Sequence, residues 1–302
     1  MKISVIIPCY NAESFIADAL QSISEQEIKP HEILIIDDGS TDSSIEVVKA
    51  QDIPIPIRIF ETDRKGAAAA RNIGIRAAEG EWLAFLDADD LWLPEHLRRA
   101  IHVIKKYDIA GYINHYHHIR HGKLQKRSSK VPHEILGYDI DDYIEFFLQY
   151  KHFVGMSACM VIRDKALKIG GLLEKQTWRH DIEFWLRVIE NARWYFDPTA
   201  TSIYRKLNPG GLSTNHAEAA YYGLIAFKRH RHRAKNLHNY NKVLEERARS
   251  AITRSFESQN QIKIERAYKL AFKHLNIRHK IFFTIIRQQP KLFPFFRRLK
   301  LV

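Results

Sequence analysis

Short runs of apolar, often β-branched residues alternate with amphipathic stretches through the first part of the chain. This pattern predicts, in order along the chain, strands at 2–8, 31–37, 58–61 and 82–87 and helices at about 12–27, 42–50 and 66–79. The alternation is typical of a parallel, doubly wound sheet, because parallel strands need a crossover that is usually a helix. Since the strands are apolar on both faces, we expect helices to cover both faces of the sheet. The predicted fold class is therefore α/β.

The pattern continues less regularly after the fourth strand. It predicts a helix over 94–106, a hairpin that turns at Gly122, a helix near 138–150, a strand near 156–162 and a helix that begins at Asp181. From about residue 217 the pattern is helical and basic, with neither an internal repeat nor a Gly/Ser linker. We therefore expect an α/β domain over residues 1–215 and a basic helical C-terminal region over residues 216–302.

Basic residues are concentrated in the last third of the chain. The 302 residues carry a formal charge of +12, but residues 217–302 hold 20 Lys and Arg against 5 Asp and Glu, a net +15. Cationic helical segments with bulky apolar residues, such as 227–236 and 277–302, are typical of contact with anionic membrane surfaces. Packing of this region on the domain stays an open alternative. Specific nucleic-acid binding is not expected, because the region contains no recognisable nucleic-acid module.

Several features favour a cytoplasmic protein. No run approaches the ~18 apolar residues that span a bilayer. The apolar run near the start is short and is broken by Pro8, so it is interpreted as a strand and not as a signal peptide. Cys9 and Cys159 offer neither a disulfide framework nor a metal-binding spacing, and are interpreted as small buried hydrophobes. We expect the protein in the cytoplasm, peripheral on the inner face of the plasma membrane if the basic region binds lipid.

Polar residues follow three of the predicted strands. These tips are Pro8-Cys9-Tyr10-Asn11, Asp37-Asp38-Gly39-Ser40 and Asp87-Ala88-Asp89-Asp90. Ligands of such sheets bind outside the carboxyl ends of the strands, so the three tips are expected on one rim. Within DDGSTD, Gly39 suits a tight turn and the next residues suit a helix cap. That structural interpretation leaves Asp37 or Asp38 to accept hydrogen bonds from a nucleobase or ribose.

Three carboxylates, Asp87, Asp89 and Asp90, lie within four residues in GEWLAFLDADDLWLP. Neighbouring carboxylates raise one another's pKa, so a fold keeps them together most readily around a cation. Oxygen ligands select Mg²⁺ or Mn²⁺, which keep open positions for substrate phosphates, and the small Ala88 lets a ligand approach. The alternative is an Asx turn or N-cap before the helix at Pro94.

Together these motifs resemble those of a family 2 glycosyltransferase of the GT-A fold. They are SVIIPCYN at 4–11, DDGSTD at 37–42, GAAAARNIGI at 66–75, GEWLAFLDADD at 80–90 and RHDIEFW at 179–185. They follow the family's order and spacing over about residues 1–215. The resemblance implies an inverting, metal-dependent enzyme that moves a sugar from a nucleotide-diphosphate donor, expected to be a UDP-sugar. The implied acceptor is a glycan or lipid-linked glycan of surface polysaccharide synthesis.

The resemblance also implies roles for individual residues. Asp87 and Asp89, with Ala88 between them, match the family's DXD metal and ribose site, and Asp90 is taken as a third metal ligand. Asp181 matches the catalytic base. Pro8, Tyr10 and Asp38 match positions that hold the nucleotide. Asn11, Asp37, Arg71 and Asn72 are further expected contacts of the donor nucleotide or its diphosphate, with pairing to a neighbouring acid as the alternative for Arg71.

The pattern around Asp181 agrees with that role. Ile182, Trp185, Leu186 and Ile189 form an apolar stripe, which places Asp181 in the first turn of a helix with one buried face. A carboxylate fixed there suits a general base, although a plain N-cap has the same position. Trp178 or Trp185 is either a platform for a sugar or part of the core.

Two positions depart from the family's pattern. His180 stands where the family usually has Glu immediately before the base. The stretch 204–213 resembles the family's Tyr-Arg-x-His-Pro-Gly, with Asn208 where His is expected. We therefore expect no third metal ligand from that stretch, while Arg205 or Lys206 is available to meet the diphosphate.

The sequence gives other functions less support. A sugar-phosphate nucleotidyltransferase shares the fold type but needs a Gly-rich, Lys/Arg-bearing loop after the first strand, and residues 10–13 are not such a loop. An inactive nucleotide-sugar-binding protein stays open. A zinc site in HYHHIRH at 115–121 is disfavoured, since the stretch lacks Cys and turns at Gly122. The absence of GxxxxGK and GxGxxG gives a P-loop kinase or nicotinamide fold little support.

Overall fold

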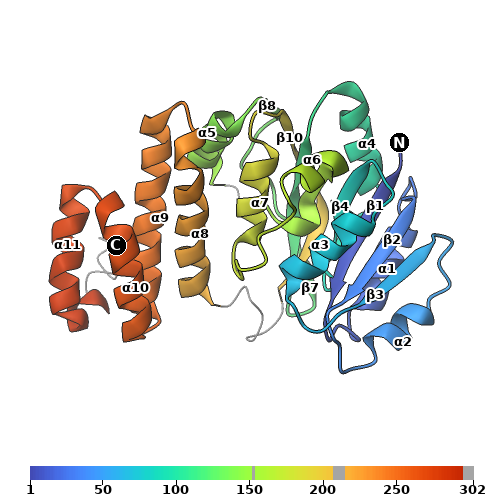
Figure 1. The fold of residues 1–302 in the computed structure, drawn as a ribbon, viewed down its shortest axis with the longest axis horizontal. Coiled ribbons are helices and arrows are strands. Elements are labelled where there is room, and N and C mark those ends of the chain that lie inside the picture. Colours follow the sequence, from blue (N-terminus) through green and yellow to red (C-terminus); the bar gives the residue numbers. More distant parts are fainter. Residues whose placement is uncertain (152–153, 207–214, 295–302) are drawn as a thin grey trace. The chain divides into compact units, whose positions relative to one another are not determined.

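The computed structural model describes residues 1–151, 154–206 and 215–294. The chain divides into two compact units, one formed by Met1–Tyr143 and Tyr150–Asn208 and the other by Ile144–Gln149 and Pro209–Val302 (Figure 1). Residues 144–149 group with the C-terminal part, which the sequence pattern does not predict. The expected boundary near residue 215 borders residues 207–214, which lie outside the described residues.

The first unit alternates strands and helices as expected. Its described strands are β1 (Ile3–Cys9), β2 (Glu32–Asp37), β3 (Ile57–Glu61), β4 (Trp82–Phe85), β5 (Leu91–Trp92), β6 (Gly111–Arg120), β7 (Lys123–Gln125), β8 (Ile135–Gly137), β9 (Cys159–Ile162) and β10 (Trp194–Lys206). Its described helices are α1 (Ile16–Ser24), α2 (Ser44–Lys49), α3 (Ala67–Ala77), α4 (His96–Lys106), η1 (Met156–Ala158), α6 (Arg163–Lys168) and α7 (His180–Val188). Helix α5 (Ile140–Tyr150) contributes residues to both units.

One mixed sheet forms the centre of this unit. The strand order is β3-β2-β1-β4-β9-β6-β10-β5, with β7 paired to β6 and β8 paired to β10. Strands β1 to β4 are parallel to one another, β9 is antiparallel to both β4 and β6, and β10 is parallel to β6. The α/β fold class is confirmed.

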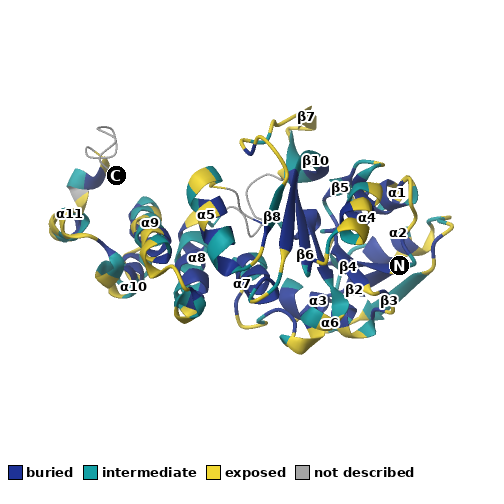
Figure 2. Ribbon diagram, turned by 90° about the horizontal axis from the view of Figure 1, so that it is seen from above, coloured by how far each residue is buried: buried dark blue, intermediate teal, exposed yellow. Residues whose placement is uncertain are grey.

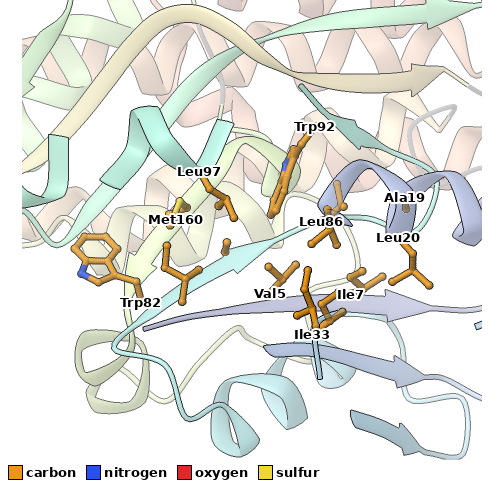
Figure 3. Close-up of a cluster of buried hydrophobic side chains, with 14 of the residues drawn as sticks. Val5, Ile7, Ala19, Leu20, Ile33, Trp82, Leu86, Trp92, Leu97 and Met160 are labelled. Atoms are coloured by element: carbon orange, nitrogen blue, oxygen red, sulfur yellow. The ribbon is translucent and has the colours of Figure 1, made fainter. Parts of the chain in front are cut away.

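Helices cover both faces of the sheet, as the apolar strands predict. On one face, Val5 and Ile7 of β1 pack in a buried cluster with Leu20 of α1 and Leu97 of α4 (Figure 3). On the other face, Phe85 at the end of β4 meets Phe184 of α7 edge to face, with ring centroids 6.0 Å apart. Figure 2 shows β2 and β4 as buried strands, with exposed residues on the outer sides of the helices. The buried sheet therefore fixes the positions of the strand ends.

Helix α3 approaches the sheet closely at a glycine. A Cβ atom added to Gly74 would lie 2.5 Å from Cγ2 of Ile6 in β1. Real Cβ atoms do not reach that separation, so a side chain here forces the helix or the strand to move. Gly74 thus sets the distance between α3 and β1, and α3 carries two of the predicted site residues.

Some elements differ from the prediction. The stretch 156–162, expected to be one strand, is the short helix η1 followed by β9. Strand β10 was not predicted at all, and its pairing with β6 shifts register between Asp197 and Ser202, around Pro198. Pro lacks a ladder donor and interrupts the alternation that marks a strand. The predicted hairpin is confirmed, since β6 and β7 pair across a turn where His121 and Gly122 have positive φ.

The second unit is helical in its described residues. It contains α8 (His216–His230), η3 (Arg231–Arg233), α9 (Leu237–Glu257), α10 (Gln261–Ala271), η4 (Phe272–His274), α11 (Ile277–Gln288) and η5 (Pro290–Leu292). An asparagine caps each of the four α-helices: the Oδ1 atoms of Asn215, Asn236, Asn260 and Asn276 accept hydrogen bonds from the N–H three residues later. Among the described residues, no helix has the length and apolar character to cross a membrane.

Candidate active site

The three polar tips lie at one edge of the sheet. Cys9 of β1 pairs with Asp37 of β2, and the Asp38 N–H donates to the Cys9 carbonyl at 2.8 Å. After β4, the Leu86 N–H donates to the Ile6 carbonyl of β1 at 3.1 Å. Because these strands are parallel, their carboxyl ends meet here, as the sequence predicts.

An acidic cluster follows β4. Asp87, Asp89 and Asp90 each offer a carboxylate oxygen, and these oxygens lie within 4.8 Å of one another. Among the described residues this is the one group of three His, Cys, Asp or Glu side chains that meets the geometry of a metal site. The side chain of Asp87 is 33% exposed, whereas Asp90 is buried. The cluster therefore opens outward at Asp87 and is anchored inward at Asp90.

Asp90 holds the turn together from the inside. One of its oxygens accepts a hydrogen bond from Ser157 Oγ at 2.5 Å, and the other accepts from the Arg205 N–H at 2.9 Å. Ser157 Oγ also accepts from the Asp87 N–H at 3.0 Å. Both oxygens of Asp90 thus have protein donors, so Asp87 and Asp89 have more capacity for an external ligand. A metal-binding role for Asp90 stays a prediction.

The carboxylates disfavour one another's charge. Burial, and then the neighbouring charge of Asp87, raise the pKa of Asp89 to about 6. Burial and the charges of Asp87 and Asp89 raise the pKa of Asp90 well above its ordinary value. A divalent cation would offset this repulsion, and carboxylate oxygens are the ligands that Mg²⁺ and Mn²⁺ prefer. The residues present therefore fit such an ion, and the roles of Asp87 and Asp89 as its ligands stay a prediction.

Arg71 joins the acidic cluster to helix α7. It is buried in α3, and its Nη2 atom forms an ion pair with Asp87 Oδ1. Its Nη1 atom lies 3.2 Å from Nε2 of His180, the first residue of α7. Because arginine only donates, His180 Nε2 must accept, which puts the ring proton on Nδ1, 3.4 Å from the Thr177 carbonyl. Burial and the charge of Arg71 also lower the pKa of His180, so the ring is neutral.

Asp181 follows His180 in the first turn of α7. The residue at the N-cap is Arg179, in the left-handed conformation with φ 56°, and it makes no side-chain cap. Asp181 is therefore not the N-cap, and its Oδ1 atom accepts from the Ile182 N–H at 2.8 Å. The Arg71–His180 contact thus brings the turn that carries Asp181 to the acidic cluster. Its role as a base stays a prediction.

Loop contacts use several predicted donor-binding residues. Asp37 Oδ1 accepts from Ser40 Oγ at 2.5 Å, and Asn11 Oδ1 accepts from the Thr41 N–H at 2.8 Å. The Asp38 carboxylate accepts from the N–H groups of Lys65 and Gly66, at 2.6 and 2.7 Å. These bonds hold the loops after β1 and β2 and the start of α3 together. Direct contact of these residues with a donor nucleotide stays a prediction.

Arg64, which the sequence motifs do not mark, contacts Tyr10, a predicted nucleotide contact. Tyr10 is 38% exposed at the end of β1, and the Arg64 guanidinium lies 4.6 Å from its ring centroid. An exposed ring backed by a cation suits stacking with a nucleobase. The sequence signal was the run Asp63-Arg64-Lys65-Gly66 before α3.

Other predicted residues are engaged within the protein. Asn72 is buried, its Nδ2 donates to Leu172 O and Glu174 Oε1, and its Oδ1 accepts from the Leu172 N–H. Its predicted contact with the donor stays a prediction.

The Arg205 guanidinium pairs with Asp18 at 3.0 Å, and Lys206 is exposed at the end of β10. Asn208 lies outside the described residues. Pro8 is half-buried in β1, and Ala88 is buried between Asp87 and Asp89.

One alternative is resolved as core. Trp185 is fully buried against Tyr143 and Trp194, with ring centroids 6.2 and 6.5 Å away, so it is not a platform for a sugar. Trp178 is half-buried just before α7, and its role as a sugar platform stays open.

The sequence did not predict the role of Ser157, which holds both Asp87 and Asp90, because a lone serine distant in the chain gives no sequence signal. Cys9 and Cys159 are buried free thiols, as predicted.

Comparison with known families and sequences gives a consistent result. Residues 4–170 match the family described as "Glycosyl transferase family 2". An uncharacterized glycosyltransferase of Haemophilus influenzae is 29% identical over 189 residues, which cover 62% of this chain and 62% of that protein. A UDP-Glc:alpha-D-GlcNAc-diphosphoundecaprenol beta-1,3-glucosyltransferase of Escherichia coli is 34% identical over 123 residues, covering 40% of this chain and 48% of that protein. In both cases the match spans less than two thirds of the relative's length.

Solved structures show the same fold. The crystal structure of Staphylococcus aureus TarS residues 1–349 in complex with UDP-GlcNAc aligns with a TM-score of 0.72. The alignment covers 92% of this chain and 82% of that chain, at 18% sequence identity. At that identity the likeness concerns the fold alone.

Proposed function

Because the chain belongs to glycosyltransferase family 2, we propose that it transfers a sugar from a nucleotide-diphosphate donor to an acceptor hydroxyl. The observation that carries the proposal is the acidic cluster after β4, linked through Arg71 to the turn that carries Asp181. Such a transfer needs ligands for the metal ion that binds the donor diphosphate. It also needs a fixed carboxylate that takes the proton of the acceptor hydroxyl.

The donor in this proposal is a UDP-sugar. Two comparisons support it: the Escherichia coli relative is named for UDP-Glc, and the TarS structure contains UDP-GlcNAc. In this chain, Tyr10, whose ring contacts the Arg64 guanidinium, would stack with the base. Asp38 accepts hydrogen bonds from the Lys65 and Gly66 N–H groups, next to Arg64 in the chain. Asp87 and Asp89 would hold the divalent cation of the diphosphate.

The proposed reaction is a single displacement with inversion. A bound Mg²⁺ or Mn²⁺ supplies positive charge for the departing diphosphate. The Asp181 carboxylate takes the proton from the acceptor hydroxyl, whose oxygen forms the new bond to the anomeric carbon. The bond from that carbon to the diphosphate oxygen breaks, and its electron pair leaves with the nucleoside diphosphate. Arg71 keeps Asp87 oriented, and neutral His180 fixes Arg71 by accepting from it.

The acceptor in this proposal is a glycan or a lipid-linked glycan, used at the cytoplasmic face of the plasma membrane. The Escherichia coli relative is named for a diphosphoundecaprenol acceptor. In α11, Ile277, Ile281 and Ile285 are 69%, 57% and 45% exposed, and their spacing of four places them on one helix face. Arg278 and Lys280 lie between them in sequence. An exposed apolar stripe with adjacent cations suits an anionic membrane surface.

A panel of nucleotide sugars tests this function. The thermal unfolding midpoint and the release of nucleoside diphosphate would be measured for each sugar, with Mn²⁺, with Mg²⁺ and with a chelator. We expect one or a few UDP-sugars to raise the midpoint and to be hydrolysed slowly, in both cases only with the metal. Stabilisation without any hydrolysis or transfer would favour an inactive nucleotide-sugar-binding protein instead.

A further inference from the structure

An open cavity of about 610 Å³ lies within the helical unit. Its lining residues are distant in sequence from the acidic cluster. It is bordered by the end of α8, by η3, by α9 and by η4. Its polar lining residues are Lys228, Arg231, His232, Asn241, Lys273 and His274. Five of these six carry a basic side chain, and no carboxylate is among the lining residues that the structure describes.

The cations of this cavity differ from three arginines elsewhere in the unit. Elsewhere, Arg254, Arg266 and Arg287 form ion pairs with Glu257, Glu218 and Glu265 at 2.5 to 2.7 Å. Over the described part of the chain, Lys228, Arg231 and Lys273 form no ion pair with a carboxylate. Like charges gathered without a counterion repel one another, so the arrangement is favoured when an anion binds.

Two further details indicate that the cavity is shaped for a ligand. Arg231 Nε donates to Asn241 Oδ1 at 2.9 Å, which orients the guanidinium and leaves its Nη donors available. The Nε2 atom of His274 is buried and has no hydrogen-bond partner within the described ranges. Burial and then the charges of Lys273, Lys228 and Arg231 lower the pKa of His274, which places that ring in the field of all three cations. A buried polar atom without a partner is costly unless a ligand supplies one.

We propose that this cavity, which we call the basic pocket, binds a phosphate-bearing anion of about the size of a diphosphate. Arg231 provides a planar fork of donors, and Lys228 and Lys273 provide point charges. A cavity of this volume exceeds the need of a single inorganic ion and accommodates a larger phosphorylated group. The phosphate belongs either to a soluble diphosphate or to a lipid headgroup, and the two sources are separated by the test below.

The test uses the full chain and inorganic pyrophosphate, measured by calorimetric titration with a chelator present so that the acidic cluster holds no metal. The pocket variant is Lys228→Ala with Arg231→Ala. The matched control is Arg249→Ala with Lys269→Ala, which removes the same charge from exposed positions on α9 and α10 outside the pocket. We expect the pocket variant to bind pyrophosphate about tenfold more weakly or worse, and the control to stay within about twofold.

A second arm identifies the source. Cosedimentation with phosphatidic acid vesicles would be compared for the same proteins. Pocket-dependent vesicle binding without pyrophosphate binding assigns the phosphate to a lipid headgroup, and pyrophosphate binding assigns it to a soluble anion. Equal losses in pocket and control variants, or no pocket-dependent binding in either arm, would overturn the proposal.

Folding does not obscure the result. Lys273 is exposed and its side chain forms no hydrogen bond or ion pair in the described residues, so Lys273→Ala provides a milder pocket variant if the double variant unfolds. The proposal is independent of sugar transfer, since it concerns neither the UDP-sugar nor Asp181. Failure of the nucleotide-sugar panel would leave the pyrophosphate titration interpretable, and the reverse also holds.

Discussion

Asp181 carries the proton transfer in the proposed reaction, and its carboxylate is fixed in the first turn of α7. Asp181→Asn keeps the size and the hydrogen-bond acceptor but removes the base. We expect sugar transfer to fall by about 10²–10⁴-fold, the usual contribution of a positioned general base. The affinity for the UDP-sugar should stay within about twofold, because the donor contacts lie elsewhere. Initial rates and donor titrations measure the two effects.

Asp164→Asn is the matched control for this variant. Asp164 also lies in the first turn of a helix, α6, but is exposed. It should transfer sugar at the rate of the unmodified protein. If Asp181→Asn retains normal transfer, the base is misassigned.

Glu32 is a buried carboxylate whose charge the fold stabilises. Burial alone would raise its pKa, but hydrogen bonds from Ser4 Oγ at 2.6 Å, from the Glu79 N–H at 2.7 Å and from Arg58 at 2.9 Å outweigh burial, and the pKa is lowered. A carboxyl with a lowered pKa in the folded state binds fewer protons there than in the unfolded state. Its stabilising contribution is therefore complete above the ordinary value of 4.5 and is lost as pH falls through the folded value.

Glu32→Gln should accordingly reduce the free energy of unfolding at neutral pH by about 1–3 kcal/mol, the cost of breaking a buried charge-assisted network. The deficit relative to the unmodified protein should shrink as the pH falls below about 4. Urea denaturation over a pH series measures this, with the exposed Glu46→Gln as control. A deficit that is independent of pH would show that charge is not the cause.

At the scale of elements, the contact between α3 and β1 positions Arg71 beside the acidic cluster. Gly74→Ala places a methyl group 2.5 Å from Ile6 Cγ2. Although alanine favours helix, we expect a net loss of about 1–3 kcal/mol from overpacking. Gly155→Ala is the control, because its added Cβ meets nothing within 4 Å and its φ is −107°. Urea denaturation of both variants measures the difference. A Gly74→Ala protein as stable as the parent would show that the contact between α3 and β1 adjusts to the methyl group without loss of stability.

The elements that the sequence predicts are those with a local signal. Strands β1, β2 and β4 are continuous apolar runs, so their ends, and the acids that follow them, were predictable together. Strand β10 carries Asp197 and Pro198 in its middle, which interrupt the apolar pattern of a strand. It is held in the sheet by its pairing with β6, which the local sequence does not reveal. The η1 turn depends on the same long-range packing. Local patterns therefore predicted the edge of the sheet that carries the polar tips, but not strand β10 or the η1 turn.

The sequence did not predict several partners of the site residues, because those partners lie far away in the chain. Arg71 was expected to meet either the donor or an acid, and the structure pairs it with Asp87 and, across 109 residues, with His180. Ser157 supports Asp87 and Asp90 from 70 and 67 residues away. No periodicity or motif encodes such contacts. The motifs nevertheless located both ends of this link, in α3 and α7.

At the scale of the whole molecule, the chain combines a slightly acidic α/β part with a strongly basic helical part. The exposed face of α11 predicts a measurable affinity for membranes (Figure 2). Ile281→Asp with Ile285→Asp should lower binding to phosphatidylglycerol vesicles by about tenfold or more, because it removes apolar contact and adds negative charge. Leu167→Asp, an exposed apolar residue of α6, serves as control.

Vesicle cosedimentation measures this effect, with neutral phosphatidylcholine vesicles for comparison. Binding should also weaken as salt concentration rises, since part of it is electrostatic. Equal vesicle binding by the α11 variant and the parent would exclude this face as the membrane contact. Basic charge alone would then have to account for any binding that remains.

In the proposed reaction, Asp87 and Asp89 hold a divalent cation on which the donor diphosphate binds. Calorimetric titration of UDP tests it most directly, using the parent protein and Asp89→Asn, each with Mn²⁺ and with a chelator, after thermal unfolding has shown that both are folded. We predict that the parent binds UDP about tenfold more tightly or better with Mn²⁺ than in chelator, and that Asp89→Asn loses this difference. Equal UDP affinity of the parent in Mn²⁺ and in chelator would contradict the account.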